Sequence, residues 1–272
     1  MKQRIITGAI LACTAVALLA IGGVVLAAAI VAIICFAVYE EYGALSKAGH
    51  HPLAWPTWAG MALSVPLLAI GGAKLLIPLA VSVALVTAAI VLFRREPKLE
   101  DIFYSLLPFV SIVLPGLGML ALTGIEPKSI QLTYLFLMIT IPCVGDIFAL
   151  YVGSTVRGPK LCPAVSPNKT ISGAIGGLVG SLLASLLVGC VAYLTAVGSR
   201  ELLPAWGHYV LLGLIGGVAG QVGDLFASLI KRHCGVKDFS NLFPGHGGML
   251  DRLDSVIFMA AIIFCYRVLI VL

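Results

Sequence analysis

Long uninterrupted apolar windows constrain the fold of this chain more than any other feature. A helix needs about twenty apolar residues to cross the hydrocarbon core of a bilayer. Such windows recur at approximately residues 5–20, 21–40, 53–73, 75–93, 102–123, 130–153, 170–198, 207–230 and 253–272. Only 11% of the residues are charged, whereas soluble domains carry roughly a quarter. The sequence therefore predicts an all-α, polytopic integral membrane protein without a soluble domain.

The number of crossings depends on the first two windows, which only Ile21-Gly22-Gly23 separates. Residues 5–40 could form two helices or one long tilted helix, so we expect nine crossings and allow eight. Lys2 and Arg4 before an apolar run also resemble the start of a secretory signal peptide, but the many later windows favour an uncleaved first anchor.

Lysine and arginine are distributed unevenly over the two sides that nine crossings create. With the N-terminus inside, thirteen of them fall on the inner side, three (Lys74, Lys128 and Arg200) fall on the outer side, and Arg267 lies within the last window. Short cytoplasmic loops retain positive charge, so we expect the charged segment 231–252 to face the cytoplasm, and a bacterial inner membrane fits the short chain. The net charge of +5 suits contact with anionic lipid headgroups. Nucleic acid is not an expected partner, because the chain lacks a folded basic module.

The two halves of the chain differ in character. Residues 1–125 consist mainly of Ala, Leu, Val and Ile, which predicts a scaffold for lipid contacts and for the contacts of a homodimer. Residues 126–272 hold the candidate chemistry, with predicted cytoplasmic loops at 154–169 and 231–252. Glycines recur at helical spacing within 173–180 and 213–223, and small residues at that spacing let helices approach closely. We therefore interpret these glycines as packing positions.

Charged side chains are concentrated between Ser228 and Asp254. The basic members are Lys231, Arg232, Lys237, His246 and Arg252, and the acidic members are Asp238, Asp251 and Asp254. Basic side chains can bind anionic oxygens, and carboxylates can hold a divalent cation that the same oxygens also bind. This mixture indicates a phosphate ester handled at a membrane surface.

Two further acids, Asp146 and Asp224, stand within apolar windows. An aspartate costs about 2.5 to 3.5 kcal/mol at the centre of a membrane helix, so we expect both to face a polar cavity. The alternative is that neighbouring hydroxyl or backbone groups satisfy them. Ser228 and Lys231 follow Asp224 by one and two helical turns and share its face.

Asp251 and Asp254 are three residues apart at the start of the last window. Acids near a helix N-terminus favour the macrodipole, which is the simplest interpretation. The preceding turn contains Gly247 and Gly248, however, and glycine lets the backbone come close to a ligand. Together with Asp224, these acids could hold magnesium, which prefers carboxylates, water and substrate phosphate oxygens.

A third polar cluster, the sequence Ser166-Pro167-Asn168-Lys169-Thr170, precedes the seventh window. We expect a helix to begin between Asn168 and Thr170, so that its free backbone N–H groups and Lys169 form a phosphate seat. A capped helix start with an inward-facing lysine explains the same residues equally well.

The segment from Ser228 to Asp254 resembles the signature of phosphatidate cytidylyltransferases, also called CDP-diacylglycerol synthases. The matching positions are Ser228, Lys231, Arg232, Lys237, Asp238, Ser240, Pro244, His246, Gly247, Gly248, Asp251, Arg252 and Asp254. The stretch from Ser166 and the pair Gly145-Asp146 also resemble this family. The chain departs from the family at Ser172, where relatives usually carry Glu before the glycine.

The resemblance implies transfer of a cytidylyl group from CTP to phosphatidic acid, with Mg²⁺ as cofactor and the option of a second cation. Expected partners are CTP, phosphatidic acid and membrane lipids. It assigns metal binding to Asp146, Asp224, Asp251 and Asp254, and catalytic roles to Asp224, Lys237, Asp238, His246, Asp251, Arg252 and Asp254. It assigns substrate binding to Ser166, Asn168, Lys169, Ser228, Lys231, Arg232, Gly247 and Gly248.

Two other functions stay open on the sequence. A related CTP-dependent lipid cytidylyltransferase or kinase could act on a prenyl or ether lipid, because tail selectivity depends on apolar packing. A cation-coupled transporter would use Asp146 and Asp224 as ion ligands near the membrane midplane, but it gives no role to the charged segment.

Overall fold

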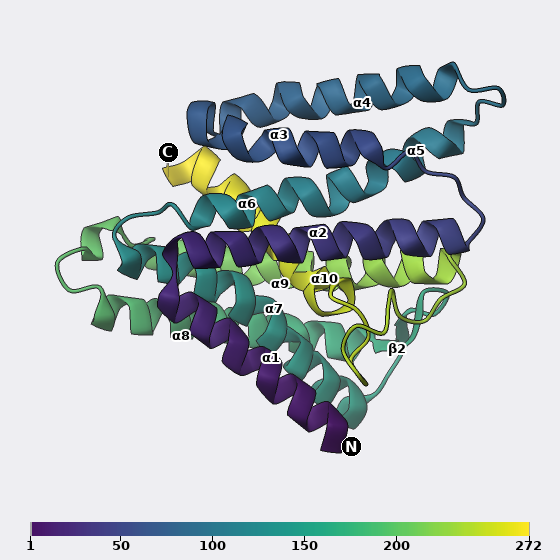
Figure 1. Ribbon diagram of the computed structural model, residues 1–272. Coiled ribbons are helices and arrows are strands. Elements are labelled where there is room, and N and C mark those ends of the chain that lie inside the picture. Colours follow the sequence, from purple (N-terminus) through teal and green to yellow (C-terminus); the bar gives the residue numbers. More distant parts are fainter. Residues whose placement is uncertain (1, 272) are drawn as a thin grey trace.

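A computed structural model describes the backbone of residues 2–271 and the side chains of residues 6–271 except residues 69 and 73, so the side chains of Lys2 and Arg4 lie outside the described part. Figure 1 shows a bundle of helices with one small hairpin at the end where α9 meets the loop before α10. The first half contains α1 (Lys2–Ile21), α2 (Gly23–Lys47), α3 (Trp55–Gly71), α4 (Leu76–Leu92), α5 (Leu99–Pro108) and α6 (Leu114–Leu122). The second half contains α7 (Lys128–Val156), β1 (Lys160–Cys162), β2 (Ser166–Thr170), α8 (Ile171–Thr195), α9 (Trp206–His233) and α10 (Leu250–Tyr266). Short helical turns lie at Gly72–Leu75, Phe109–Val113, Arg200–Leu202 and Arg267–Val271.

The predicted all-α membrane fold is confirmed. Each of the nine apolar windows coincides with a helical segment, and α5, the turn at Phe109–Val113 and α6 together form one continuous rod. In the described part of the chain, six helical segments are long and apolar enough to cross a membrane, and two shorter apolar helices accompany them. The chain is therefore an integral membrane protein.

Residues 5–40 form two helices instead of one long tilted helix. The break lies at Gly22 and Gly23, whose φ angles of 67° and 54° belong to the left-handed region that glycine adopts without a steric penalty. Lys128 Nζ donates a 2.8 Å hydrogen bond to the Ala20 carbonyl next to this break. The bend sends α1 obliquely across the second half of the molecule, as Figure 1 shows.

The expected helix start between Asn168 and Thr170 is wrong by one to three residues. Residues 166–170 instead form β2, which pairs antiparallel with β1, and α8 begins at Ile171. Proline disfavours helical backbone in the residue before it, so Pro167 keeps Ser166 extended at the start of the strand. The Thr170 hydroxyl caps the helix by accepting a 3.1 Å hydrogen bond from Gly173 N. Asn168 and Lys169 thus project from a hairpin beside the helix bundle.

The glycine runs pack helices closely, as predicted. A Cβ atom added at Gly213 of α9 would lie 2.9 Å from Leu182 Cα of α8, and one added at Gly177 of α8 would lie 3.2 Å from the Gly145 carbonyl of α7. Real Cβ atoms essentially never come as close as 2.9 Å to a neighbour, and 3.2 Å is tighter than most real Cβ contacts, so glycine at these crossings favours the close approach of α7, α8 and α9.

The buried core runs across the predicted boundary at residue 125. Ile34 and Val38 of α2 belong to the same buried cluster as Met259 and Ile263 of α10. The division into a scaffold half and a catalytic half stays a prediction, because the core itself is shared by both halves.

We expect Gly217→Ala to destabilise the protein and Gly207→Ala, in the same helix, to leave its stability unchanged or slightly higher. A Cβ at position 217 would lie 2.8 Å from Ser181 Cβ, whereas one at position 207 would meet nothing within 4 Å. Overpacking costs about 1–3 kcal/mol, while replacing an exposed helical glycine by alanine gains up to about 1 kcal/mol. Thermal unfolding of both variants in detergent measures the difference. Equal melting temperatures would contradict the close α8–α9 contact.

Candidate active site

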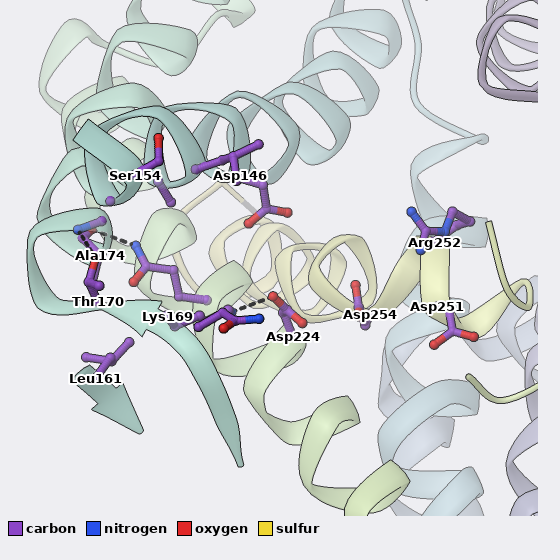
Figure 2. A pocket seen from close by; sticks show the side chains of 16 residues that line it. Asp146, Ser154, Leu161, Lys169, Thr170, Ala174, Asp224, Asp251, Arg252 and Asp254 are labelled. Atoms are coloured by element: carbon purple, nitrogen blue, oxygen red, sulfur yellow. Dashed lines mark hydrogen bonds and ion pairs between the residues drawn. The ribbon is translucent and has the colours of Figure 1, made fainter. Parts of the chain in front are cut away.

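A cavity of about 560 Å³ lies between α7, α8, α9, α10 and the β1–β2 hairpin. Its polar lining consists of Asp146, Ser154, Asn168, Lys169, Thr170, Gln221, Asp224, Asp251, Arg252 and Asp254, and its apolar lining includes Leu150 and Leu161. Figure 2 shows Asp146, Lys169, Asp224 and Asp254 coming together from different elements, with Arg252 to one side. Seven residues that the sequence predicted for the site therefore share one cavity.

Four aspartates from three helices line this cavity. Asp146 comes from α7, Asp224 from α9, and Asp251 and Asp254 from the first turns of α10. In Figure 2, Asp146, Asp224 and Asp254 surround the same space, while Asp251 lies at its edge. The predicted convergence of separate helices is confirmed. In the part of the chain that the structure describes, however, no three His, Cys, Asp or Glu side chains form a ready metal-binding group.

Lys169 of β2 neutralises one of the four aspartates. Its ammonium group forms an ion pair with Asp224 and so reaches from β2 to α9. Both side chains are partly exposed, at 27% and 29%. The hairpin therefore places a positive charge beside the acids of the cavity.

Asp251 is engaged by its own chain. Its Oδ1 atom accepts a 2.6 Å contact from Lys231 Nζ, and its Oδ2 atom accepts 2.9 Å hydrogen bonds from the backbone N–H groups of Phe239 and Gly248. The Asp251 side chain is only 2% exposed, and a buried carboxylate needs such partners. Asp251 thus ties the end of α9 and the loop to the start of α10.

The glycine turn before α10 makes room for carboxylates of the protein itself. A Cβ added at Gly247, whose φ angle is 78°, would lie 2.8 Å from Asp251 Oδ2. One added at Gly248 would lie 2.6 Å from Glu40 Oε1. The Gly248 N–H group is also used internally, by Asp251. We expected these glycines to approach a substrate, but neither lines the cavity.

Glu40 of α2 is a neighbour of this turn that the sequence analysis missed. It is 5% exposed and accepts hydrogen bonds from Ser240 Oγ (2.6 Å), Met249 N (2.9 Å) and Leu250 N (2.8 Å). A signal was present, because Glu40 and Glu41 stand within an apolar helix of 25 residues, where acids are costly and functional. The predicted window 21–40 ended at Glu40, so the two acids fell at its edge instead of inside it.

Several predicted site residues lie outside the cavity lining. They are Ser166, Ser228, Lys231, Arg232, Lys237, Asp238, His246, Gly247 and Gly248. Arg232 Nε donates a 3.4 Å hydrogen bond to the Val165 carbonyl of the hairpin. Lys237 and Asp238 are exposed, and His246 Nδ1 is buried without a hydrogen-bond partner among the described residues. These nine residues therefore do not form the wall of the cavity, although Lys231 contacts Asp251, which does.

Ser172, where relatives usually carry Glu, is also outside the cavity lining. Its hydroxyl donates to the Arg157 carbonyl and contacts the Thr170 hydroxyl at 3.1 Å. The residue therefore fastens the start of the hairpin to the start of α8 through neutral hydrogen bonds.

We expect Lys231→Met to destabilise the protein by about 3 kcal/mol, because it leaves the buried Asp251 carboxylate without its cationic partner. Lys237→Met is the matched control, since Lys237 is exposed in the same segment. Thermal unfolding in detergent compares the two variants. A Lys231→Met variant as stable as the control would contradict the structural role assigned to this ion pair.

Comparisons with known proteins agree with the geometry. A model of the cytidylyltransferase family matches residues 2–270. The phosphatidate cytidylyltransferase of Brucella abortus is 34% identical over 56% of this chain and 52% of its own length, and that of Bacillus subtilis is 33% identical over 57% and 56%. The chain thus spans about half the length of these relatives. The phosphatidate cytidylyltransferase of Synechocystis is 33% identical over 98% of this chain and 96% of its own length.

Proposed function

The chain belongs to the cytidylyltransferase family, and from that premise we propose that it transfers a cytidylyl group from CTP to phosphatidic acid. A phosphate oxygen of phosphatidic acid attacks the α-phosphorus of CTP. A new P–O bond forms, the bond to the oxygen that bridges the α- and β-phosphorus atoms breaks, and pyrophosphate leaves. The products are CDP-diacylglycerol and pyrophosphate. The nucleophile is an ionised phosphate, so the reaction needs no activating serine or histidine.

The observation that carries this proposal is the composition of the cavity. Asp146, Asp224 and Asp254 lie beside the cations of Lys169 and Arg252 in a volume of about 560 Å³, which is within the range of small-molecule sites. The two substrates are both anions and repel one another. Fixed cations can hold both of them in line for transfer, which is the main requirement of phosphoryl-group chemistry.

We propose Mg²⁺ as the cofactor, held by Asp224 and Asp254 with Asp146 beside them. Carboxylate oxygens are the ligands that Mg²⁺ prefers, and the Lys169–Asp224 ion pair marks a position where the acids stabilise a positive charge. When bound, the ion would neutralise the triphosphate and orient it. Asp251 already uses both oxygens within the protein, so its proposed contribution is to fix the start of α10.

The remaining cavity residues address the substrates. Lys169 and Asn168 project from the hairpin and can bind phosphate oxygens once Lys169 releases Asp224. Arg252 is exposed on the other side and can hold the departing pyrophosphate. Lys237, Asp238 and His246 can contact only parts of a substrate that extend beyond the cavity.

The apolar wall of the cavity fits the lipid substrate. Leu150 and Leu161 line it and are exposed, and the neighbouring Tyr151 and Val156 of α7 are exposed too. We propose that phosphatidic acid enters from the bilayer past α7 while CTP enters from the cytoplasm. The bacterial inner membrane, the cytoplasmic orientation and the homodimer stay predictions.

We expect Asp224→Asn to lower kcat by about 100-fold or more, the scale of losing one charged group that acts on the transition state. Glu201→Gln is the control, because Glu201 is exposed in the turn before the N-terminal end of α9, whereas Asp224 lies towards the C-terminal end of that helix. The assay follows radiolabelled CTP into liponucleotide in vesicles that contain phosphatidic acid. Near-normal turnover of Asp224→Asn would refute the assignment of this acid.

We also expect a chelator to abolish liponucleotide formation and added Mg²⁺ to restore it, because the carboxylates of Asp146, Asp224 and Asp254 repel a triphosphate unless a divalent cation intervenes. The same assay with ATP, GTP and UTP should give little product. Full activity in excess chelator would rule out the divalent ion. Uptake of a solute into sealed vesicles without any liponucleotide would favour the transporter instead.

A further inference from the structure

We propose that Glu40 is a positioning residue for the proposed reaction, acting from the N-terminal half of the chain on the first turn of α10. The inference rests on the proposed function for its kinetic consequence. Glu40 lies outside the signature segment at residues 228–254 and precedes Ser240 by 200 residues.

The contacts of Glu40 are those of a charged cap for a helix from another part of the chain. The first backbone N–H groups of a helix have no partner within the helix. Glu40 Oε1 accepts from Met249 N at 2.9 Å and Glu40 Oε2 accepts from Leu250 N at 2.8 Å. A carboxylate at this end also interacts favourably with the helix dipole. Two of the unpaired groups at the start of α10 therefore depend on one side chain of α2.

The third contact of Glu40 extends its hold to the loop before α10. Ser240 Oγ donates to Glu40 Oε1 at 2.6 Å and itself accepts from Leu242 N at 3.1 Å. Glu40 therefore fastens the loop at residues 240–242 and again at residues 249 and 250. The close fit at Gly248, described above, leaves no room for a shifted turn.

The segment that Glu40 fixes contains the cavity residues of α10. Leu250 is followed directly by Asp251 and Arg252, and Asp254 comes one turn later. All three line the cavity. Asp251 holds the same turn from the other side through Gly248 N and Phe239 N. Two buried carboxylates, one from each half of the chain, thus determine where Arg252 and Asp254 stand relative to Asp224.

The first test separates positioning from folding by hydrogen exchange. In Glu40→Gln the amide NH₂ group cannot accept from a backbone N–H, so we expect peptides covering residues 240–252 to exchange about tenfold faster, as the loss of a hydrogen bond to a charged group predicts. Peptides of α9 within 206–230 should exchange as in the unaltered protein. The control is Glu100→Gln, the same change at an exposed acid of α5.

The second test measures kcat and KM for CTP. We expect kcat of Glu40→Gln to fall about 10- to 100-fold, the scale of a small misplacement of reacting groups, with a much smaller change in KM. Glu40→Asp keeps the charge and should recover part of kcat. Glu100→Gln should behave as the unaltered protein.

Different outcomes of the two tests contradict the role of Glu40 and the proposed function. Unchanged exchange of residues 240–252 in Glu40→Gln overturns the inference, and so does faster exchange with unchanged kcat, which would make Glu40 merely structural. If Glu40→Gln does not fold, Glu40→Asp takes its place in both tests under the same criteria. If the unaltered protein makes no liponucleotide, the proposed function fails, while hydrogen exchange still decides whether Glu40 holds the first turn of α10.

Discussion

Buried carboxylates organise the end of the molecule that contains the loop between α9 and α10. Because they are shielded from water, they need partners within the protein. An unpaired buried charge is costly enough to unfold part of a domain. Asp251 meets this requirement with Lys231 and two backbone N–H groups, and Glu40 meets it with Ser240 and the start of α10. The position of the loop before α10 follows from these bonds. These bonds also fix the start of α10, which carries Arg252 and Asp254 to the cavity.

The helix bundle supplies the second condition for the site. Glycine at the crossings of α7, α8 and α9 brings their backbones together, and this close packing carries Asp146 and Asp224 to the same cavity. Neither acid would be tolerated on a lipid-facing surface. The same helices present apolar side chains outward, so a polar cavity and an apolar outer surface coexist within a few helical turns.

The helical segments could be predicted from the sequence because apolar length alone determines them. Asp251 and Asp254 were added to the site from their spacing after the glycine turn and from the family resemblance, and a polar cavity for Asp146 and Asp224 could be predicted because both stand within apolar windows. The hairpin at residues 160–170 could not, since a few residues pair there only when the bundle holds both strands. The partners of Asp251 lie in α9 and in the loop before α10, and the contacts of Glu40 depend on how α2 packs against α10. That packing has no periodic pattern, so the glycine turn was interpreted as a ligand contact when it accommodates side chains of the protein.

The Lys169–Asp224 ion pair has a consequence for the substrate-free protein. Like charges that face one another across a small volume would push the helices apart, yet here a flexible ammonium group serves as an internal counter-ion. Such a tethered charge needs no recruitment from solution. With Lys169 bound to Asp224 and Lys231 bound to Asp251, side chains of the protein itself neutralise two of the four aspartates that line the cavity.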